Sequence, residues 1–165
     1  MKIIAVIPAR SGSKGVTNKN IRELAGRPLI GYSIMVAKMA KLIDRIIVST
    51  DSEKYASLAI EYGAEVPFLR PSEYSGDKST DYDFVKHLLD WLADNEDVLP
   101  DYIVHLRPTT PFRDPDVLDN AIRTANVYST TDLVYGILKL DDFTNIDVSI
   151  VIGANDIVNP SAQTD

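Results

Sequence analysis

The chain has 165 residues, of which 45% are hydrophobic and 25% are charged, so we expect one soluble globular domain over residues 1–165. The absence of cysteine excludes disulfide bonds and thiolate metal sites, and two histidines, His87 and His105, disfavour a histidine-based zinc site. The net charge of −7 argues against nucleic-acid binding, because that function needs a basic face.

The apolar runs are too short for a membrane span, which needs about 18 to 20 residues. The apolar start at residues 3–7 leads directly into Arg10, and this order fits a buried strand better than a signal peptide. We therefore expect a cytoplasmic protein that does not bind membranes.

Short apolar runs alternate along the chain with longer helical patterns, which is typical of β-α units on a parallel sheet. We expect strands at residues 3–7, 45–49, 66–69 and 102–106. We expect helices from Pro28 to about Lys41, from Ser52 to Gly63, from Thr80 onward and from Pro115 to about Val127. These elements predict a three-layer, Rossmann-like α/β domain, with a mainly parallel sheet flanked by helices.

Capping residues support three of the expected helix starts. Asp51 or Ser52 can cap the second helix. Thr80 with Asp83 three residues later is close to a capping box, and Asp114 precedes a proline at the start of the last helix.

Two loops that follow strands carry most of the chemistry. Residues 9–20 follow the first strand, and residues 107–113 form a stiff, basic loop after the strand at 102–106. In open α/β sheets, ligands bind outside the carboxyl ends of the strands. We therefore expect both loops to lie at one edge of the sheet and to form a binding site together.

Basic residues are concentrated in the first part of the chain. Residues 1–45 carry nine Lys or Arg and two acidic residues, so the other 120 residues have a net charge of −14. A basic block in an acidic protein favours a small polyanionic ligand over a polymer. For Lys38, Lys41 and Arg45, a solvated helix face is the simpler interpretation.

The loop at 9–20 has the composition of an anion-binding loop. Gly12 and Gly15 allow sharp turns that bring backbone amide groups close to an anion. Its hydroxyl and cationic donors are Ser11, Ser13, Arg10, Lys14 and Lys19. Such a loop can hold a triphosphate and neutralise a leaving pyrophosphate. It matches neither a Walker A loop nor a G-x-G-x-x-G loop, and a solvated basic loop is the alternative.

The same residues resemble a known family. The stretch IIAVIPARSGSKGVTNKN, followed by LAGRPLIGYSI, resembles the opening of the CMP-sialic acid synthetase (acylneuraminate cytidylyltransferase) family. The resemblance continues through STDSEKYASLA, FLRPSEYSGDKSTDYDFV and HLRPTTPFRDPDVLDNAI and covers about residues 1–123. It implies a nucleotide-binding fold and transfer of CMP from CTP to the anomeric hydroxyl of a sialic-acid-type sugar acid, with release of pyrophosphate.

This resemblance implies roles for particular residues. Arg10 and Lys19 would be catalytic, since they would stabilise charge on the bridging and leaving oxygens, and Mg²⁺ would complete the neutralisation. The implied nucleotide-binding residues are Pro8, Ala9, Arg10, Ser11, Gly12, Ser13, Lys14, Gly15, Lys19, Asn20, Arg70 and Ser79. Arg107 stands where the sialic acid branch usually has Gln near the sugar, and it would bind the substrate, for which a carboxylate is the suitable group.

The resemblance ends after residue 123. The later part of the family contributes a dimerisation and sugar-binding insert and an acidic motif that holds the metal, and nothing after residue 123 matches them. Asp141 and Asp142 form an acidic pair, for which a solvated turn is the favoured interpretation. The metal ligands therefore stay unknown at this point.

Residues 124–165 differ in composition, with six Asp, one Lys and no Arg. We expect strands at 132–138 and 148–153, a turn or short helix at 139–143 and a loop at 154–165. The strings TDLVYGI and IDVSIVIGANDIVNPSAQTD resemble the NADP-binding domain of the NAD(P) transhydrogenase β subunit. The tail would then be a two-strand extension of different origin, joined near residues 123–128.

Three functions stay open on the sequence. The first is a cytidylyltransferase, either complete or inactive because the metal-binding and sugar-binding parts are missing. The second is an engineered chimera or a structural α/β protein without catalytic activity. The third, an NADP-binding module, ranks last because the tail lacks a Gly-rich loop and a clamp for the 2′-phosphate. The sugar acid and the oligomeric state are not determined.

Overall fold

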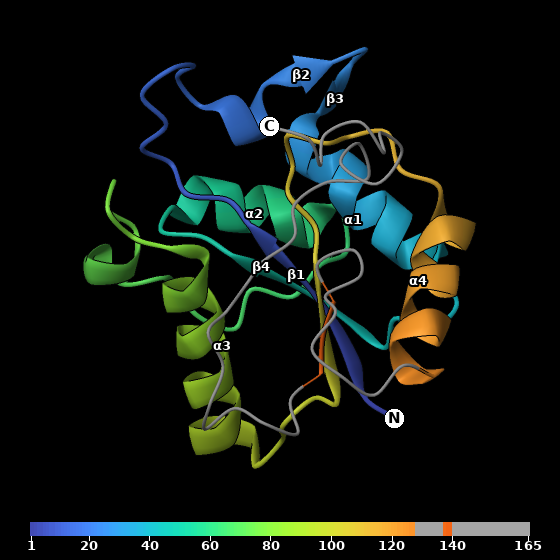
Figure 1. Cartoon of the computed structure of the whole chain (residues 1–165). Helices are drawn as coiled ribbons and strands as arrows, with labels where there is room; N and C mark the ends of the chain where they lie inside the picture. Colours follow the sequence, from blue (N-terminus) through green and yellow to red (C-terminus); the bar gives the residue numbers. More distant parts are fainter. Residues whose placement is uncertain (128–136, 140–165) are drawn as a thin grey trace, which may run out of the picture.

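The computed structural model describes residues 1–127 and 137–139. Within these residues the larger sheet has four strands in the order β4-β1-β5-β6 (Figure 1). The strands are β1 (Ile3–Pro8), β4 (Arg45–Ser49), β5 (Tyr102–His105) and β6 (Ile137–Lys139). β1 pairs in parallel with both β4 and β5, whereas β6 pairs antiparallel with β5. The sheet is therefore mainly parallel, as the sequence pattern predicts.

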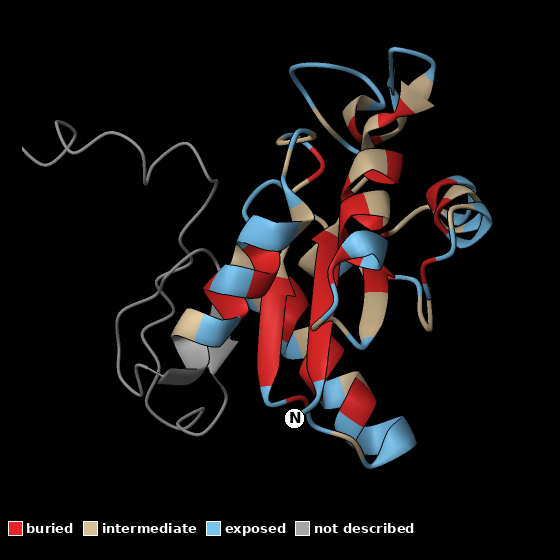
Figure 2. Cartoon of the chain, turned by 90° about the vertical axis from the view of Figure 1, so that its right-hand side faces the viewer, coloured by how far each residue is buried: buried red, intermediate tan, exposed pale blue. Residues whose placement is uncertain are grey.

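Helices cover both faces of this sheet. They are α1 (Leu29–Met39), α2 (Glu53–Glu61), α3 (Asp81–Glu96) and α4 (Pro115–Val127). Ile3, Ala5 and Ile7 of β1 share a core with α1, α2 and α4, whereas Ile4 and Val6 share a second core with α3. All five side chains are at most 1% exposed, and Figure 2 shows this buried centre in red. The predicted three-layer α/β fold is confirmed.

Capping contacts explain where the helices start. The Ser52 side chain accepts a hydrogen bond from a backbone N–H in the first turn of α2. The Asp83 carboxylate accepts one from the Thr80 backbone N–H at 2.6 Å, and Asp114 accepts one from the first turn of α4 at 2.9 Å. Gly63, just after α2, has a φ of 90°, which favours glycine. The predicted helix boundaries at these positions are confirmed.

A small hairpin precedes α1 and was not predicted. Its strands are β2 (Glu23–Leu24) and β3 (Arg27–Pro28), which pair antiparallel. Ala25 and Gly26 at its turn have φ values of 50° and 77°. Two positive φ values in a two-residue turn match the twist of a tight hairpin. Strands of two residues are too short to produce a recognisable hydrophobic period.

The predicted strand at 66–69 is wrong. This segment only touches the sheet through single parallel bridges, at Glu65 and at Leu69. Pro67 lies between them and has no backbone N–H to donate to a neighbouring strand. The described residues also include the 3₁₀ turns η1 (Lys19–Ile21) and η2 (Ser72–Tyr74).

The tail is described only at β6, which overlaps the strand predicted at 132–138. The other predictions for the tail lie outside the described residues: the rest of the segment at 139–143, the acidic pair at 141–142, the strand at 148–153 and the loop at 154–165. Among the helices that the structure describes, none is both long and apolar enough to cross a membrane.

Candidate active site

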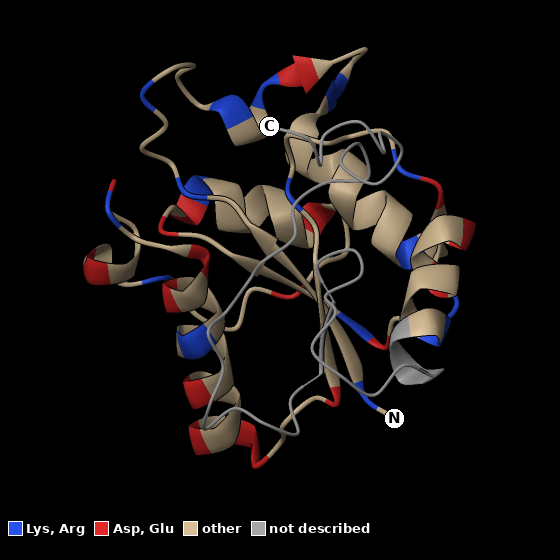
Figure 3. Ribbon diagram, viewed as in Figure 1, with Lys and Arg blue, Asp and Glu red and all other residues tan. Residues whose placement is uncertain are grey.

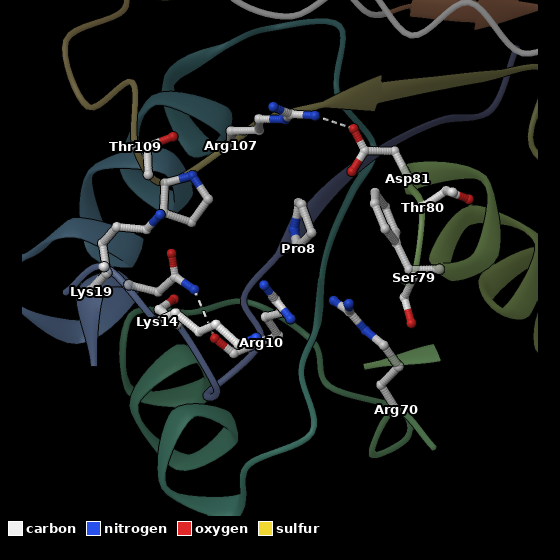
Figure 4. Close-up of a pocket in the computed structure, with 15 residues that line it drawn as sticks. Pro8, Arg10, Lys14, Lys19, Arg70, Ser79, Thr80, Asp81, Arg107 and Thr109 are labelled. Carbon is white, nitrogen blue, oxygen red and sulfur yellow. Dashed lines mark hydrogen bonds and ion pairs between the residues drawn. The ribbon is translucent and has the colours of Figure 1, made fainter. Parts of the chain in front are cut away.

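A cleft opens where the carboxyl ends of β1 and β5 leave the sheet. It has a volume of about 430 Å³ and lies between the loop at 9–20, the segment at 70–84 and the loop at 107–113 (Figure 4). Its lining residues are Pro8, Arg10, Ser13, Lys14, Gly15, Lys19, Asn20, Arg70, Ser79, Thr80, Asp81, Phe84, Arg107, Pro108 and Thr109. The two loops that we expected to form a site together therefore border the same cleft.

Most residues that the sequence assigned to ligand binding line this cleft. They are Pro8, Arg10, Ser13, Lys14, Gly15, Lys19, Asn20, Arg70, Ser79 and Arg107. Ala9, Ser11 and Gly12 are not among the lining residues. Ala9 is fully buried, and its carbonyl oxygen accepts a hydrogen bond from the Thr50 hydroxyl at 2.7 Å. This hydrogen bond ties the residue that follows β1 to the residue that follows β4.

One hydroxyl group of the loop at 9–20 anchors the loop to the protein, although the composition of the loop predicts that its hydroxyls contact a ligand. The Ser11 backbone N–H and hydroxyl donate to the Asp51 carboxylate, at 2.7 and 3.0 Å, instead of facing the cleft. Gly12 and Gly15 have no positive φ, and a Cβ at either position would meet no atom within 4 Å. The left-handed residue of this loop is Asn18, with a φ of 54°. The backbone at these two glycines is therefore also open to other residues, and their role in anion binding stays a prediction.

At one end of the cleft, two cations of this loop share one carboxylate. Asp77 lies 3.2 Å from an Arg10 guanidinium nitrogen and 2.5 Å from Lys14 Nζ. Hydrogen bonds from Lys14 and Arg10 hold the pKa of Asp77 below its usual range. Asn20 is buried and donates to the Arg10 carbonyl at 3.0 Å, which fixes the backbone of the loop. Figure 3 shows basic residues in blue on the loop that follows β1 and acidic residues in red along α3.

Arg70 forms a buried cationic wall of the cleft and is only 6% exposed. Its guanidinium donates to the Ser49 hydroxyl at 2.9 Å and to the Ser49 carbonyl, and it lies 5.2 Å from the centre of the Phe84 ring. Burial lowers the pKa of Arg70 to about 10, so the side chain is still charged at neutral pH. These partners are neutral, which leaves its positive charge directed at the cleft.

At the other end of the cleft, Arg107 pairs with the Asp81 carboxylate at the start of α3. The Arg107 carbonyl oxygen accepts hydrogen bonds from the Arg113 guanidinium at 2.9 Å and from the Thr110 backbone N–H at 3.2 Å. Burial lowers the pKa of Arg113 to about 10. The loop at 107–113 therefore has an internal brace that holds Arg107 in place.

The two histidines are partly buried, His87 in α3 and His105 at the end of β5. His105 Nε2 is buried without a hydrogen-bond partner among the described residues, and its ring packs 5.3 Å from the Phe84 ring. Burial lowers the pKa of His105 to about 4, so its ring is neutral at pH 7. His87 Nδ1 is likewise buried and unpaired within the described part, and its ring packs 4.5 Å from Phe68.

The described residues do not form a ligand set for Mg²⁺. Within residues 1–127, no group of three or more His, Cys, Asp or Glu could hold a metal ion. The carboxylate that lines the cleft, Asp81, and the neighbouring Asp77 both pair with basic side chains. A Mg²⁺ ion prefers several free oxygen ligands, so these contacts do not suit it. The metal implied by the sequence stays a prediction.

Sequence reasoning missed several residues of the cleft wall. They are Thr80, Asp81, Phe84, Pro108 and Thr109. Pro108 and Thr109 belong to the loop that was expected to form the site. The sequence therefore predicted the loop but not which of its residues line the cleft. Asp81 sits at a helix start, where an acidic residue is ordinary, and no sequence pattern reveals that it faces Arg107.

Comparison with known protein families accounts for most of the chain. Residues 4–149 match the model of the cytidylyltransferase family. The chain belongs to this family. The match continues past the junction predicted near residues 123–128, so it gives no support to a chimera or to a transhydrogenase origin of the tail.

Curated cytidylyltransferases share substantial sequence identity with this chain. It is 43% identical over 122 residues to an N-acylneuraminate cytidylyltransferase of Escherichia coli, covering 74% of this chain and 28% of that protein. It is 42% identical over 129 residues to the CMP-N,N'-diacetyllegionaminic acid synthase of Legionella pneumophila, covering 77% of this chain and 54% of that protein. A pseudaminic acid cytidylyltransferase of Campylobacter jejuni is 35% identical over 121 residues, covering 73% and 52% of the two chains.

Solved structures share the fold. A CMP:2-keto-3-deoxy-manno-octonic acid synthetase complexed with CTP superposes with a TM-score of 0.65 at 19% identity, covering 77% of this chain and 48% of that one. A 4-diphosphocytidyl-2C-methyl-D-erythritol synthase has a TM-score of 0.59 at 16% identity, covering 76% and 55%. The chain spans about half the length, or less, of the relatives that it matches.

Proposed function

We propose that this cytidylyltransferase-family chain binds CTP in the cleft and serves the transfer of CMP to a sialic-acid-type sugar acid. The observation that carries the proposal is the collection of five cationic side chains around one cleft, contributed by three separate segments. They are Arg10, Lys14, Lys19, Arg70 and Arg107. The names of the relatives support a sugar acid of the sialic acid type as the acceptor.

The proposed reaction forms one bond and breaks one. The anomeric hydroxyl oxygen of the sugar acid attacks the α-phosphorus of CTP, and the bond from the α-phosphorus to the bridging oxygen of the β-phosphate breaks. The hydroxyl proton passes to solvent and pyrophosphate leaves. Negative charge grows on the bridging and leaving oxygens, so fixed cations nearby lower the barrier.

In this proposal the two ends of the cleft have different tasks. Arg10 and Lys19 stabilise the phosphates, above the backbone of residues 11–15. Arg70 and Ser79 contact the cytidine end. Arg107, which its loop holds in place, binds the carboxylate of the sugar acid. The contacts described above support this division, because Arg10 and Arg107 lie in different loops that border one cleft.

Mg²⁺ belongs to this proposal only as an expectation from the resemblance. When bound, such an ion would neutralise phosphate charge. The described residues offer no ligand set for it, and none of the residue roles proposed above depends on it.

Thermal unfolding with CTP, and separately with NADP⁺, tests the nucleotide assignment. A ligand that binds only the folded state stabilises it by about 2.7 kcal/mol at a hundredfold excess over Kd, which for a chain of this size raises the Tm by roughly 5 to 10 °C. We expect this rise with CTP and not with NADP⁺. A Tm that CTP leaves unchanged would refute the proposal.

Pyrophosphate release then tests the reaction. The sugar acids named by the relatives, N-acylneuraminate, N,N'-diacetyllegionaminate and pseudaminate, form the substrate panel. With a sugar acid that is turned over, we expect Arg107→Gln to raise the KM for the sugar acid and to leave the KM for CTP unchanged. If Arg107→Gln raised only the KM for CTP, Arg107 would bind the nucleotide and not the sugar acid.

A further inference from the structure

Asp77, near one end of the cleft, pairs with two cationic side chains at once, whereas Asp81 pairs with one. Asp77 lies in the turn between η2 and α3, 67 residues from Arg10 in the sequence. Its two carboxylate oxygens contact cations, Arg10 at 3.2 Å through Oδ1 and Lys14 at 2.5 Å through Oδ2. One carboxylate thus neutralises two of the cations that a polyphosphate would need.

Two other aspartates show what a structural carboxylate looks like in this protein. Asp51 accepts hydrogen bonds from the backbone N–H and the hydroxyl of Ser11. Asp119 is 2% exposed and accepts hydrogen bonds from the backbone N–H groups of Lys41 and Leu42, each at 3.0 Å. Asp51 and Asp119 accept hydrogen bonds from neutral donors of the fold, whereas Asp77 pairs with charged side chains, of which Lys14 is 80% exposed.

The contacts of Asp77 are weak enough to exchange. Its side chain is 46% exposed and that of Lys14 is 80% exposed, so solvent screens both ion pairs. Lys14 and Arg10 hold the pKa of Asp77 below its usual range, as expected for a carboxylate that pairs with two cations. A triphosphate carries several charges and more acceptor oxygens than one carboxylate, and charge-assisted hydrogen bonds favour it.

We propose that Asp77 is a built-in competitor for anions: its carboxylate occupies Arg10 and Lys14, and a polyphosphate binds by displacing it. This inference rests on the proposed function, because it assigns the same two cations to phosphate. Its consequence is that Asp77 sets the affinity of the cleft. The apparent affinity for a polyphosphate equals the intrinsic affinity multiplied by the fraction of molecules in which Asp77 has released the two cations.

A charge-removing variant with a matched control tests this inference. Asp77→Asn keeps the size of the side chain and removes its charge, whereas Asp90→Asn makes the same change on α3, where Asp90 pairs with Lys86. The probe is inorganic tripolyphosphate, titrated calorimetrically at low and at high salt. We expect Asp77→Asn to bind it about three- to tenfold more tightly than the wild type at low salt, with a smaller gain at high salt, and Asp90→Asn to bind it like the wild type.

Binding of tripolyphosphate by Asp77→Asn that equals or is weaker than that of the wild type would overturn the inference. Undetectable binding by both proteins would overturn it as well. Weaker binding would mean that Asp77 positions Arg10 for the phosphates. Hydrogen exchange at the backbone amides of residues 11–19, measured without any ligand, gives a second readout. We expect faster exchange in Asp77→Asn because the loop loses its tether, and unchanged exchange would contradict that tether. Failure of the proposed function is a separate result, in which the wild type does not bind CTP.

Discussion

The two loops that border the cleft differ most in how exposed their ion pairs are. The loop at 9–20 is largely exposed, and its cations Arg10 and Lys14 are paired with one exposed carboxylate. The loop at 107–113 is braced from inside, because the Arg113 guanidinium donates to the Arg107 carbonyl. Exposed ion pairs exchange partners easily, whereas a hydrogen bond shielded from solvent, even partly, holds its geometry better.

The pKa shifts follow the same division. At the braced end, burial is the cause, and it lowers the pKa of His105 to about 4 and that of Arg113 to about 10. At the exposed end, the pKa of Asp77 is lowered by its hydrogen bonds to Lys14 and Arg10. From this comparison we predict that the loop at 107–113 contributes more to folding stability, and that the cations of the loop at 9–20 are more open to exchange with an anionic ligand.

The largest expected effect is a pH dependence of stability at the braced end. The pKa of His105 is about 4 in the folded protein and near 6.5 when unfolded, so only the unfolded state takes up a proton between these values. Burial is the main cause, Arg107, Arg113 and Arg70 add to it, and Asp81 opposes it. Stability is therefore lost as the pH falls through this window, by about 3 kcal/mol.

Urea unfolding at several pH values between 4 and 7 measures this loss. We expect His105→Gln to reduce the loss, since Gln does not titrate. Identical pH dependence in the wild type and the variant would show that His105 titrates normally in the folded protein.

A smaller effect is expected from the brace itself. Arg113→Ala removes the donor to the Arg107 carbonyl, and we expect a loss of about 2 kcal/mol in the free energy of unfolding. Lys14→Ala is the matched change at the exposed end, with an expected loss below about 0.5 kcal/mol. Chemical denaturation of both variants checks the contrast. Equal losses would remove the distinction between the two loops.

The salt dependence of ligand binding gives the third expectation. If exposed cations of the loop at 9–20 hold the phosphates, raising the salt concentration from about 50 to about 500 mM weakens CTP binding by roughly tenfold. Calorimetric titration at both concentrations measures this change. An affinity that salt does not alter would place the phosphates among buried groups instead.

Much of the fold follows from local sequence patterns. The apolar runs predict β1, β4 and β5, and capping residues such as Ser52 and Asp114 predict where helices begin. The segment at 66–69 has the composition of a strand, but Pro67 prevents regular pairing. The β2–β3 hairpin was not predicted, because its strands are only two residues long.

The chemistry of the cleft could be predicted only in part. The cations of the loop at 9–20 were found from composition and from the family resemblance. Their partner Asp77 was not, because it lies 67 residues from Arg10 and only the tertiary structure brings the two together. The same holds for Asp81, which is 26 residues from Arg107.

The most direct test of the central claim, that the loop at 9–20 binds the triphosphate, is calorimetric titration of CTP into the wild type and two variants. Arg10→Ala removes a cleft cation, and Arg123→Ala removes an exposed cation of α4 that bonds only to Asn120 among the described residues. We predict a loss of affinity of at least about tenfold for Arg10→Ala and wild-type affinity for Arg123→Ala. Wild-type affinity in Arg10→Ala would contradict the account.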